Sequence, residues 1–567
     1  MRAIVRCAGM ICLAAVVVAP MLAAENEGLA DLDEATRLKV VAHTLGDLGQ
    51  VIQLCESALE KGLDEDNTKL AKTLLAATSI QRGMIVADEL FDQMPPDPNW
   101  RQYRDFALRN LEKGLKIDPR QPRAQLMVAK LNLLPGGDAE QVKRALDQAI
   151  QLSTDEPGLR AAALTLRAGL AEAPEKKLAD LNEALRAVPH ALAALRARAG
   201  LYADQGQYDK ALADLDRAVQ LKPDHPGTHL LRAVVLVELK RYDEAIASLD
   251  KAHQLQPNSP VPLIQKARIY GLEENFKAAL HELNLAHELA PANPTVLLLR
   301  ATVYQELGQG DKALEDVDAV LARNPDHADA RRLRALVLAG EGKFDAAIAE
   351  MEQLQKSQAT DTMDRLRLAM FYAAGEKPQK AVDLYTKVLE QQPDNAFALR
   401  GRADALLSMG KHAQAIADYE KFLKLNPDDP GVLNNLSWVL STSPFDQLRD
   451  GKRALELALK ACELTEYKKA HILSTLAAAY AELGQFDTAI QWSQKALEVA
   501  SGREKASLEK ELATYKQGKP FRELLSAPEP EQEKPAEEEG PPEKHEQAPP
   551  EKQQPPDKPE PPAPPEA

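Results

Sequence analysis

The sequence contains few aromatic residues and few cysteines. Only 4% of its 567 residues are Phe, Trp or Tyr, and Ala and Leu dominate. Closely packed small helices are therefore favoured over a sheet with a bulky core. Two of the four cysteines, Cys7 and Cys12, lie in an N-terminal apolar stretch, whereas Cys55 and Cys462 stand far apart without a CxxC neighbour. We expect no cysteine metal site, and predict that Cys55 and Cys462 are small buried side chains.

Motifs for catalysis and cofactor binding are also absent. The 28 glycines stand mostly singly, so no glycine-rich loop is available to hold a nucleotide. The 11 histidines include no HExxH motif and no Cys/His cluster. Pairs of carboxylates on helix surfaces are expected by chance in a chain with 86 acidic residues. The sequence therefore predicts a protein without cofactor, metal or catalytic activity.

The charge balance and the N-terminus limit the compartment and the partners. A formal net charge of −16 disfavours nucleic acid and anionic membrane surfaces as partners. Arg2 and Arg6 precede an apolar run over residues 7–21, and Leu22-Ala23-Ala24 precedes Glu25. This layout is typical of a secretory signal and predicts export to the periplasm or cell envelope, or secretion. Because Leu22 suits cleavage after Ala24 poorly, an uncleaved membrane anchor is the alternative, and only then is the membrane a partner.

Internal prolines follow a period of 34 residues. Pro223, Pro257, Pro291, Pro325, Pro393 and Pro427 share one phase, and Ala359 takes the missing position. An alanine stands twelve residues before each of these points, from Ala211 to Ala415. A small side chain at such a position lets two helices approach closely. The sequence therefore predicts seven consecutive repeats over residues 192–429.

Each repeat is predicted to contain two amphipathic helices. In the second repeat, residues 228–239 precede a turn at Lys240-Arg241, and residues 242–256 form a second helix that a proline ends. The order of small residue, aromatic, turn glycine, second aromatic, alanines and proline resembles the tetratricopeptide repeat. In the first repeat these residues are Ala199, Tyr202, Gly206, Tyr208, Ala211, Ala218 and Pro223. The resemblance implies an all-α fold, an α-solenoid in which helix hairpins stack into a right-handed superhelix.

The repeat pattern weakens toward both ends of the chain. A five-residue insertion is expected around Ser443 to Arg449, and Leu508, Leu512 and Tyr515 share one face of a final helix. Residues beyond Ser526 have almost no aliphatic side chains, so burial cannot offset the entropy of ordering them. The predicted organisation is a signal peptide (1–24), a degenerate helical region (25–157), the repeat array (158–503), a capping helix and exit (504–525) and a disordered Pro/Glu/Lys-rich tail (526–567).

The seventh position of most repeats carries a cation. The sixteenth residue after it is then acidic or a serine, as for Arg300 and Asp316, whereas Leu368 is matched by Leu384. The cations are Arg198, Arg232, Lys266, Arg300, Arg334 and Arg402. A cation in the first helix is thus matched by an acidic residue or a serine in the second, and an apolar residue is matched by another apolar residue. We therefore predict contacts between the two helices of each repeat, and not a row of basic side chains that binds acidic ligands.

The resemblance also implies a binding surface. In this family, positions 2, 5, 9, 12 and 13 of the first helix line the concave face. The candidate residues are Leu230, Val234, Ile264, Arg268, Leu298, Arg332, Leu336, Leu366, Met370, Phe397 and Arg400. An apolar track with interspersed arginines suits an extended peptide or an amphipathic helix. The alternative is that several of these side chains pack against the next repeat.

Three functions are compatible with these observations. The first is a non-catalytic scaffold that binds protein or peptide segments of exported proteins on its concave face. The second is an architectural or spacer protein of the cell envelope. The third is an enzyme with a site hidden in residues 25–157. Partner capture by the concave face would distinguish the first from the second, and a pocketed domain in the N-terminal region would favour the third.

Overall fold

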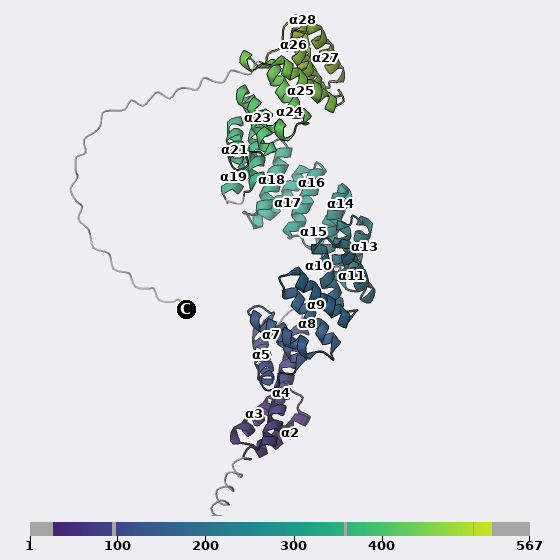
Figure 1. Cartoon of the computed structure of the whole chain (residues 1–567), viewed down its shortest axis with the longest axis vertical. Helices are drawn as coiled ribbons and strands as arrows, with labels where there is room; N and C mark the ends of the chain where they lie inside the picture. Colours follow the sequence, from purple (N-terminus) through teal and green to yellow (C-terminus); the bar gives the residue numbers. More distant parts are fainter. Residues whose placement is uncertain (1–25, 93–97, 357–359, 503, 524–567) are drawn as a thin grey trace, which may run out of the picture. The chain divides into compact units, whose positions relative to one another are not determined.

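The computed structural model describes residues 26–92, 98–356, 360–502 and 504–523. The predicted signal peptide (1–24) and the predicted tail (526–567) lie outside the described residues. The chain divides into two compact units, Met1–Leu333 and Arg334–Ala567. Each unit consists of α-helices joined by short turns, and the described residues contain no β-strand (Figure 1).

Consecutive helices in each unit pack against one another. The first unit contains α2 (Leu29–Val41), α3 (Leu45–Lys61), α4 (Glu65–Asp92), α5 (Trp100–Ile117), α6 (Pro122–Asn132), α7 (Ala139–Leu152), α8 (Pro157–Leu170), α9 (Pro174–Ala187), α10 (Leu192–Asp204), α11 (Tyr208–Leu221), α12 (Pro226–Glu238), α13 (Tyr242–Leu255), α14 (Val261–Leu272), α15 (Phe276–Leu289), α16 (Pro294–Glu306) and α17 (Gly310–Arg323). Helix α18 (Ala328–Gly340) contains the boundary between the units. The second unit continues with α19 (Phe344–Lys356), α20 (Thr362–Ala374), α21 (Pro378–Gln391), α22 (Ala396–Ser408), α23 (His412–Leu425), α24 (Pro430–Thr442), the 3₁₀ turn η1 (Asp446–Leu448), α25 (Gly451–Leu464), α26 (Ala470–Glu482), α27 (Phe486–Val499) and α28 (Glu504–Lys516).

The 34-residue repeat is realised as a pair of helices of 12 to 14 residues. In the second repeat, α12 and α13 occupy the two predicted helical segments, and Lys240 in the turn between them has a φ of 57°. Gly206, Glu274 and Gly308 take positive φ at the same position of their repeats. The conformation is therefore imposed by the turn, and glycine is the residue that adopts it at least cost.

Alanines stand where the two helices of each repeat meet. Ala211, Ala245, Ala279, Ala313, Ala347, Ala381 and Ala415 are all fully buried. A larger side chain there would push the helices apart, because interaxial distances depend on the residues at the contact. This buried alanine in every repeat confirms the predicted α-solenoid.

The N-terminal hairpin of α4 and α5 departs from the 34-residue pattern. Helix α4 has 28 residues and α5 has 18, so this pair is longer than the other hairpins of its unit. Glycines bring the two helices together: a Cβ on Gly83 would lie 2.9 Å from the Ala107 carbonyl oxygen, and one on Gly114 would lie 2.8 Å from that of Ala76. Both glycines are therefore required by close packing.

The C-terminal helices end in a segment that runs back along α24. An irregular stretch with η1 joins α24 to α25, where the sequence predicts the insertion. Leu508, Leu512 and Tyr515 are buried on α28, as their spacing predicts. After α28, the backbone N–H of Glu523 donates to the Thr442 carbonyl at 3.1 Å. The last described residues are thus held against the first helix of an earlier repeat.

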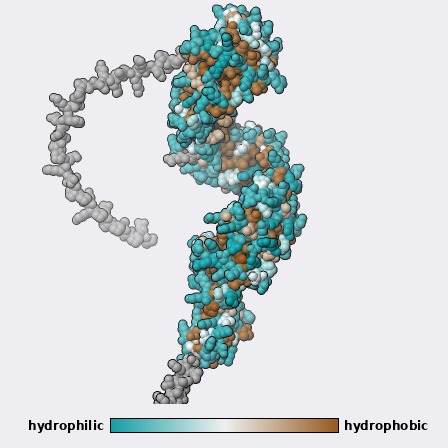
Figure 2. All heavy atoms as spheres, in the orientation of Figure 1, coloured by the Kyte–Doolittle hydropathy of each residue, from teal (hydrophilic) through white to brown (hydrophobic). Residues whose placement is uncertain are grey.

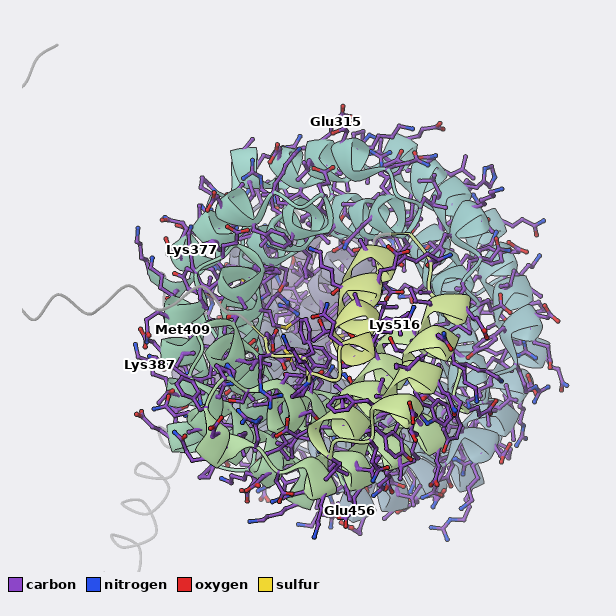
Figure 3. The ribbon with its side chains drawn as sticks, turned by 90° about the horizontal axis from the view of Figure 1, so that it is seen from above. Glu315, Lys377, Lys387, Met409, Glu456 and Lys516 are labelled. Carbon is purple, nitrogen blue, oxygen red and sulfur yellow. The ribbon has the colours of Figure 1, made fainter. Side chains whose placement is uncertain are left out.

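Hydrophilic side chains cover most of the surface that Figure 2 shows, and apolar patches lie between them. Charged side chains such as Glu315, Lys387 and Glu456 point outward from their helices (Figure 3), where they are exposed. The apolar patches are the first places to look for a binding surface.

Candidate functional site

The cations at the seventh position pair with the second helix of their own repeat. Arg300 Nη2 lies 2.7 Å from Asp316 Oδ1, and Arg402 Nε lies 2.7 Å from Asp418 Oδ2. The same contact joins Arg198 to Asp214, Lys266 to Glu282 and Arg334 to Glu350 as ion pairs, and Arg232 to Ser248 as a hydrogen bond. The predicted internal contacts are confirmed, so these cations are engaged in holding each hairpin together.

The same cations also reach the preceding repeat, which the sequence reasoning missed. Arg300 Nη1 donates to Asn284 Oδ1 at 3.2 Å, so Arg300 contacts α15 as well as α17. Equivalent contacts join Arg198 to Asn182, Arg232 to Asp216, Lys266 to Asp250 and Arg402 to Thr386. Each of these five cations thus connects three helices. Hydrogen bonding to Asp316 raises the pKa of the Arg300 guanidinium above its ordinary value.

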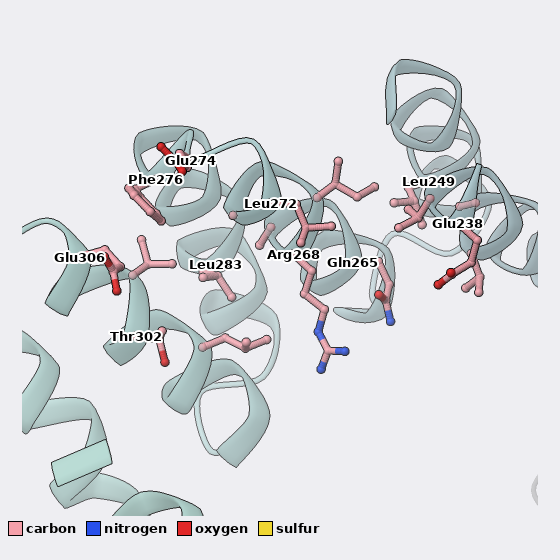
Figure 4. Close-up of a pocket in the computed structure, with 18 residues that line it drawn as sticks. Glu238, Leu249, Gln265, Arg268, Leu272, Glu274, Phe276, Leu283, Thr302 and Glu306 are labelled. Atoms are coloured by element: carbon pink, nitrogen blue, oxygen red, sulfur yellow. The ribbon is translucent and has the colours of Figure 1, made fainter. Parts of the chain in front are cut away.

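A groove of about 760 Å³ lies in the first unit on the first helices of three consecutive repeats, α12, α14 and α16 (Figure 4). Small residues leave this space, because Ala233, Ala267 and Gly271 contribute little side-chain volume to its lining. Val234 and Leu272 stand at the groove with 47% and 63% of their surface exposed. An apolar groove of this size with exposed aliphatic side chains is typical of a binding site.

Charged side chains surround the apolar floor. Glu238 ends α12, Glu274 lies in the turn after α14 and Glu306 ends α16. Arg268 is exposed on α14, and in Figure 4 its guanidinium extends beyond the helix into open space. Within the described part of the chain, Arg268 makes no ion pair. The groove therefore offers one positive group near its middle and three carboxylates around it.

The predicted residues of the first unit have different exposures. Val234 and Arg268 line the groove. Leu230, Leu298 and Arg332 are half-buried. The prediction was wrong for Ile264, which is only 7% exposed. Ile264 packs in a core cluster with Leu263, Ala286 and Val296, because the fifth position of this repeat faces the neighbouring helices α15 and α16.

Two of the five predicted residues of the second unit, Phe397 and Arg400, line a common cavity. Phe397 is 74% exposed and lines a cavity of about 550 Å³ with Arg400 and Leu425. Arg400 Nη1 lies 3.7 Å from Asp429 Oδ2. Met370 is 56% exposed but does not line this cavity, and Leu336 is half-buried. The prediction was wrong for Leu366, which is 5% exposed and belongs to the core.

Several residues of the first groove were missed from the sequence. Val237, Glu238, Leu272 and Glu306 all line it. They occupy positions 12 and 13 of their repeats, whereas the predicted residues occupy positions 2, 5 and 9. One feature of the sequence could have predicted this part of the groove. Leu272 is an apolar residue at a position where the adjacent repeats carry Glu238 and Glu306.

The described residues show no metal centre and no membrane span. No group of three or more His, Cys, Asp or Glu among them could hold a metal ion. None of the helices that the structure describes combines the length and the apolar composition needed to cross a bilayer. Cys55 and Cys462 are buried, as predicted, and burial raises the pKa of Cys55 to about 11 and that of Cys462 to about 12. Such thiols are protonated at neutral pH and are poor nucleophiles.

Family models match four segments of the chain. The tetratricopeptide repeat matches residues 202–269, 396–429 and 470–501, and the N-terminal tetratricopeptide repeats region of Psidin matches residues 299–402. DnaJ homolog subfamily C member 3 of Rattus norvegicus is 30% identical over 163 residues, which are 29% of this chain and 28% of that protein. The chain thus matches less than a third of the length of this curated relative.

Solved structures of repeat proteins are also similar. A tetratricopeptide repeat protein from Parabacteroides merdae is 19% identical with a TM-score of 0.33, over 51% of this chain and 98% of that chain. The C-terminal part of a repeat protein from Cytophaga hutchinsonii is 21% identical with a TM-score of 0.36, over 42% and 96%. The repeat matches and the helix hairpins described above together identify the chain as a tetratricopeptide repeat protein.

Proposed function

We propose that the protein is a non-catalytic scaffold that binds an apolar segment of another exported protein in the groove on α12, α14 and α16. The observation that carries this proposal is the groove itself, which exposes Val234 and Leu272 above a floor of small and aliphatic residues. Exposed apolar surface of this kind usually marks an interaction site. Stacked repeats also present their first helices as one continuous binding surface.

The groove favours a segment of particular composition. Aliphatic or aromatic side chains of the partner would fill the floor and displace water from Val234 and Leu272. Arg268 is available to an acidic side chain or a backbone carbonyl. Glu238 and Glu306 lie at the ends of α12 and α16 and suit basic residues that flank the apolar stretch. An extended or helical segment with this order of residues is the expected ligand.

A paired substitution tests the groove. Val234→Asp with Leu272→Asp places two carboxylates in the apolar surface, so recovery of cross-linked partners from the native cells should be lost. Both sites are exposed, so each substitution should change the free energy of unfolding by only about 0.5 kcal/mol or less. Helicity and the melting temperature should therefore stay close to those of the wild type. The matched control is Ile85→Asp with Leu221→Asp. Ile85 lies within α4 and is 40% exposed, and Leu221 ends α11 and is 45% exposed, so this pair also combines a mid-helix site with a helix end.

The outcomes separate the alternatives. Lost recovery with unchanged melting in the groove variant, and normal recovery in the control, supports the scaffold. Unchanged recovery of partners in both variants would mean that the groove binds no partner, which favours a spacer protein of the cell envelope. A clear fall in melting of the groove variant alone would mean that these side chains belong to the core. Catalysis by an isolated fragment of residues 25–157 would instead favour an enzyme.

We also propose that the protein is exported. The support is the sequence of residues 1–24, with Arg2 and Arg6 before the apolar run and small residues before Glu25. The N-terminal residue of protein purified from the native host tests this proposal. A mature chain that begins at Glu25 is expected, whereas intact residues 1–24 in a membrane fraction would indicate an uncleaved anchor.

A further inference from the structure

A further cavity of the second unit lies between the first helices of the last repeats and is lined by both polar and apolar side chains. It has a volume of about 310 Å³ and is lined by residues of α24, α26 and α28, with Leu407 of α22 at its edge. Asn434, Trp438 and Glu511 are the residues that give it a chemical character. A volume near 300 Å³ is at the small end of ligand pockets. It can hold one side chain or a small molecule.

A chain of hydrogen bonds fixes the orientation of Asn434. The Tyr419 hydroxyl and the Asn435 side-chain N–H₂ both donate to Asp404 Oδ1, at 2.5 and 3.2 Å. Because a carboxylate only accepts, Asn435 must present its Nδ2 to Asp404 and its Oδ1 to Asn434. Asn434 therefore donates its Nδ2 to Asn435, at 3.2 Å, and its own Oδ1 is left as an acceptor.

That acceptor has no donor among the described residues. Asn434 is 8% exposed, and its Oδ1 is buried without a hydrogen-bond partner. A buried polar atom that has lost water and gained no partner is costly to fold. Because Asn434 lines the cavity, the cavity is the place from which a donor can be supplied.

Glu511 adds a carboxylate to the same cavity. It is 4% exposed and accepts hydrogen bonds from the Ser474 and Ser507 hydroxyls, the latter at 3.4 Å. Within the part of the chain that the structure describes, Glu511 has no cationic partner. Burial raises the pKa of Glu511 above its ordinary value, as expected for a carboxylate without a counter-charge. Glu504 also lines the cavity, and no Lys or Arg does.

Trp438 supplies an aromatic wall that is held in place. Its indole Nε1 donates to Glu523 Oε2 at 2.7 Å, and its ring centroid lies 5.9 Å from that of Phe521. Both contacts come from the segment that follows α28, so they fix the indole plane. An indole face attracts cations through its quadrupole. The cavity is therefore lined by two carboxylates, an amide group whose oxygen has no hydrogen-bond partner among the described residues, and an indole ring.

We propose that this cavity binds a primary alkylammonium group. An ammonium has three N–H donors and one positive charge, which match the Glu511 carboxylate and the Asn434 Oδ1. Leu407 and Leu508 at the wall suit the methylene groups that precede the nitrogen. A divalent metal ion fits less well, because no group of three or more His, Cys, Asp or Glu is assembled among the described residues. This site is separate from the groove on α12, α14 and α16, and its proposal does not depend on the function proposed for that groove.

The ammonium can belong to a lysine side chain of a bound polypeptide or to a free amine. The test uses the full chain labelled with 5-fluorotryptophan, whose three tryptophans are Trp100, Trp438 and Trp492. A Trp438→Phe variant assigns the Trp438 fluorine resonance. The probes are Nα-acetyl-lysine amide, butylammonium and the uncharged Nα-acetyl-norleucine amide.

Addition of Nα-acetyl-lysine amide should shift the Trp438 resonance saturably and leave the other two in place. Norleucine amide should not shift it. Tighter binding of the lysine amide than of butylammonium assigns the site to a lysine side chain, and tighter or equal binding of butylammonium assigns it to a free amine. An absence of saturable shift with either amine, or an equal shift with norleucine amide, overturns the proposal.

Two variants test the chemistry of the site. Glu511→Gln keeps the shape of the side chain but removes its charge, so it should weaken binding by about tenfold or more. Glu509→Gln, an exposed residue of the same helix, is the matched control and should bind as the wild type does. Asn434→Ala removes the second acceptor and should also weaken binding, so it replaces Glu511→Gln if that variant does not fold. Unchanged affinity in a folded Glu511→Gln or Asn434→Ala variant contradicts the proposal.

Discussion

Arg300 and Asp316 allow the contacts that hold each repeat together to be measured. Their side chains form two hydrogen bonds of 2.8 and 2.7 Å, and they are only 12% and 8% exposed. Removing one partner of such a pair leaves a nearly buried charge alone, so Arg300→Leu should lower the local free energy of unfolding by about 2 to 4 kcal/mol. Adding Asp316→Leu should recover most of this loss, because another repeat carries Leu368 and Leu384 at the same positions. Asn284 still loses its donor in the double variant, so about 1 kcal/mol should remain lost.

Hydrogen exchange of the amides in α16 and α17 is the suitable assay. A repeat array can open locally, so a single global unfolding energy is not well defined for it. The double-mutant cycle should give a coupling energy of about 2 kcal/mol or more between Arg300 and Asp316, because each single substitution leaves the other charge without its partner. The control is the exposed pair of Lys377 and Asp345, at 40% and 87% exposure, for which a much smaller coupling energy is expected because solvent screens the charges. Additive losses for Arg300 and Asp316 would refute the contact as a source of stability.

Two further predictions concern the tail and a buried histidine. Removal of residues 526–567 should leave the melting temperature unchanged, because that composition buries no apolar surface, and a clear shift would mean that the tail docks on the array. Burial lowers the pKa of His412, which is 2% exposed and contacts Ser443 Oγ at 3.0 Å. Its contribution to stability is therefore complete above about pH 6.5 and is lost as the pH falls below that value. His412→Phe introduces the aromatic residue that another repeat carries at the same position, Phe344. On acidification the melting temperature of this variant should fall less than that of the wild type, and equal falls would contradict the prediction.

The parts of the fold that depend on one repeat could be predicted from the sequence. The 34-residue spacing located both helices of each repeat, since proline and the small residues act within one hairpin. The partner of Arg300 was also predictable, because Arg300 and Asp316 change to Leu368 and Leu384 together in another repeat. The turn at Lys240 takes positive φ although it lacks glycine, because the same turn geometry recurs in every repeat.

The parts that depend on packing between repeats could not be predicted. Contact of Arg300 with Asn284 requires the angle between adjacent hairpins, which the spacing within one repeat does not determine. Packing between hairpins also decides that Ile264 is buried whereas Leu230, at the same position of the preceding repeat, is half-buried. The cavity around Glu511 is built from three repeats, and no local pattern marks it. The long hairpin of α4 and α5 lies outside the 34-residue period altogether.

The central claim is that the groove on α12, α14 and α16 holds a segment of another protein. A photo-cross-linking amino acid placed at Leu272 tests it directly in the native cells, with the same amino acid at Leu221 as the control outside the groove. We expect a discrete cross-linked partner from position 272, lost when Val234→Asp is added, and none from position 221. Cross-linking that is equal at both positions, or absent at 272, would contradict the claim that this groove is the binding site.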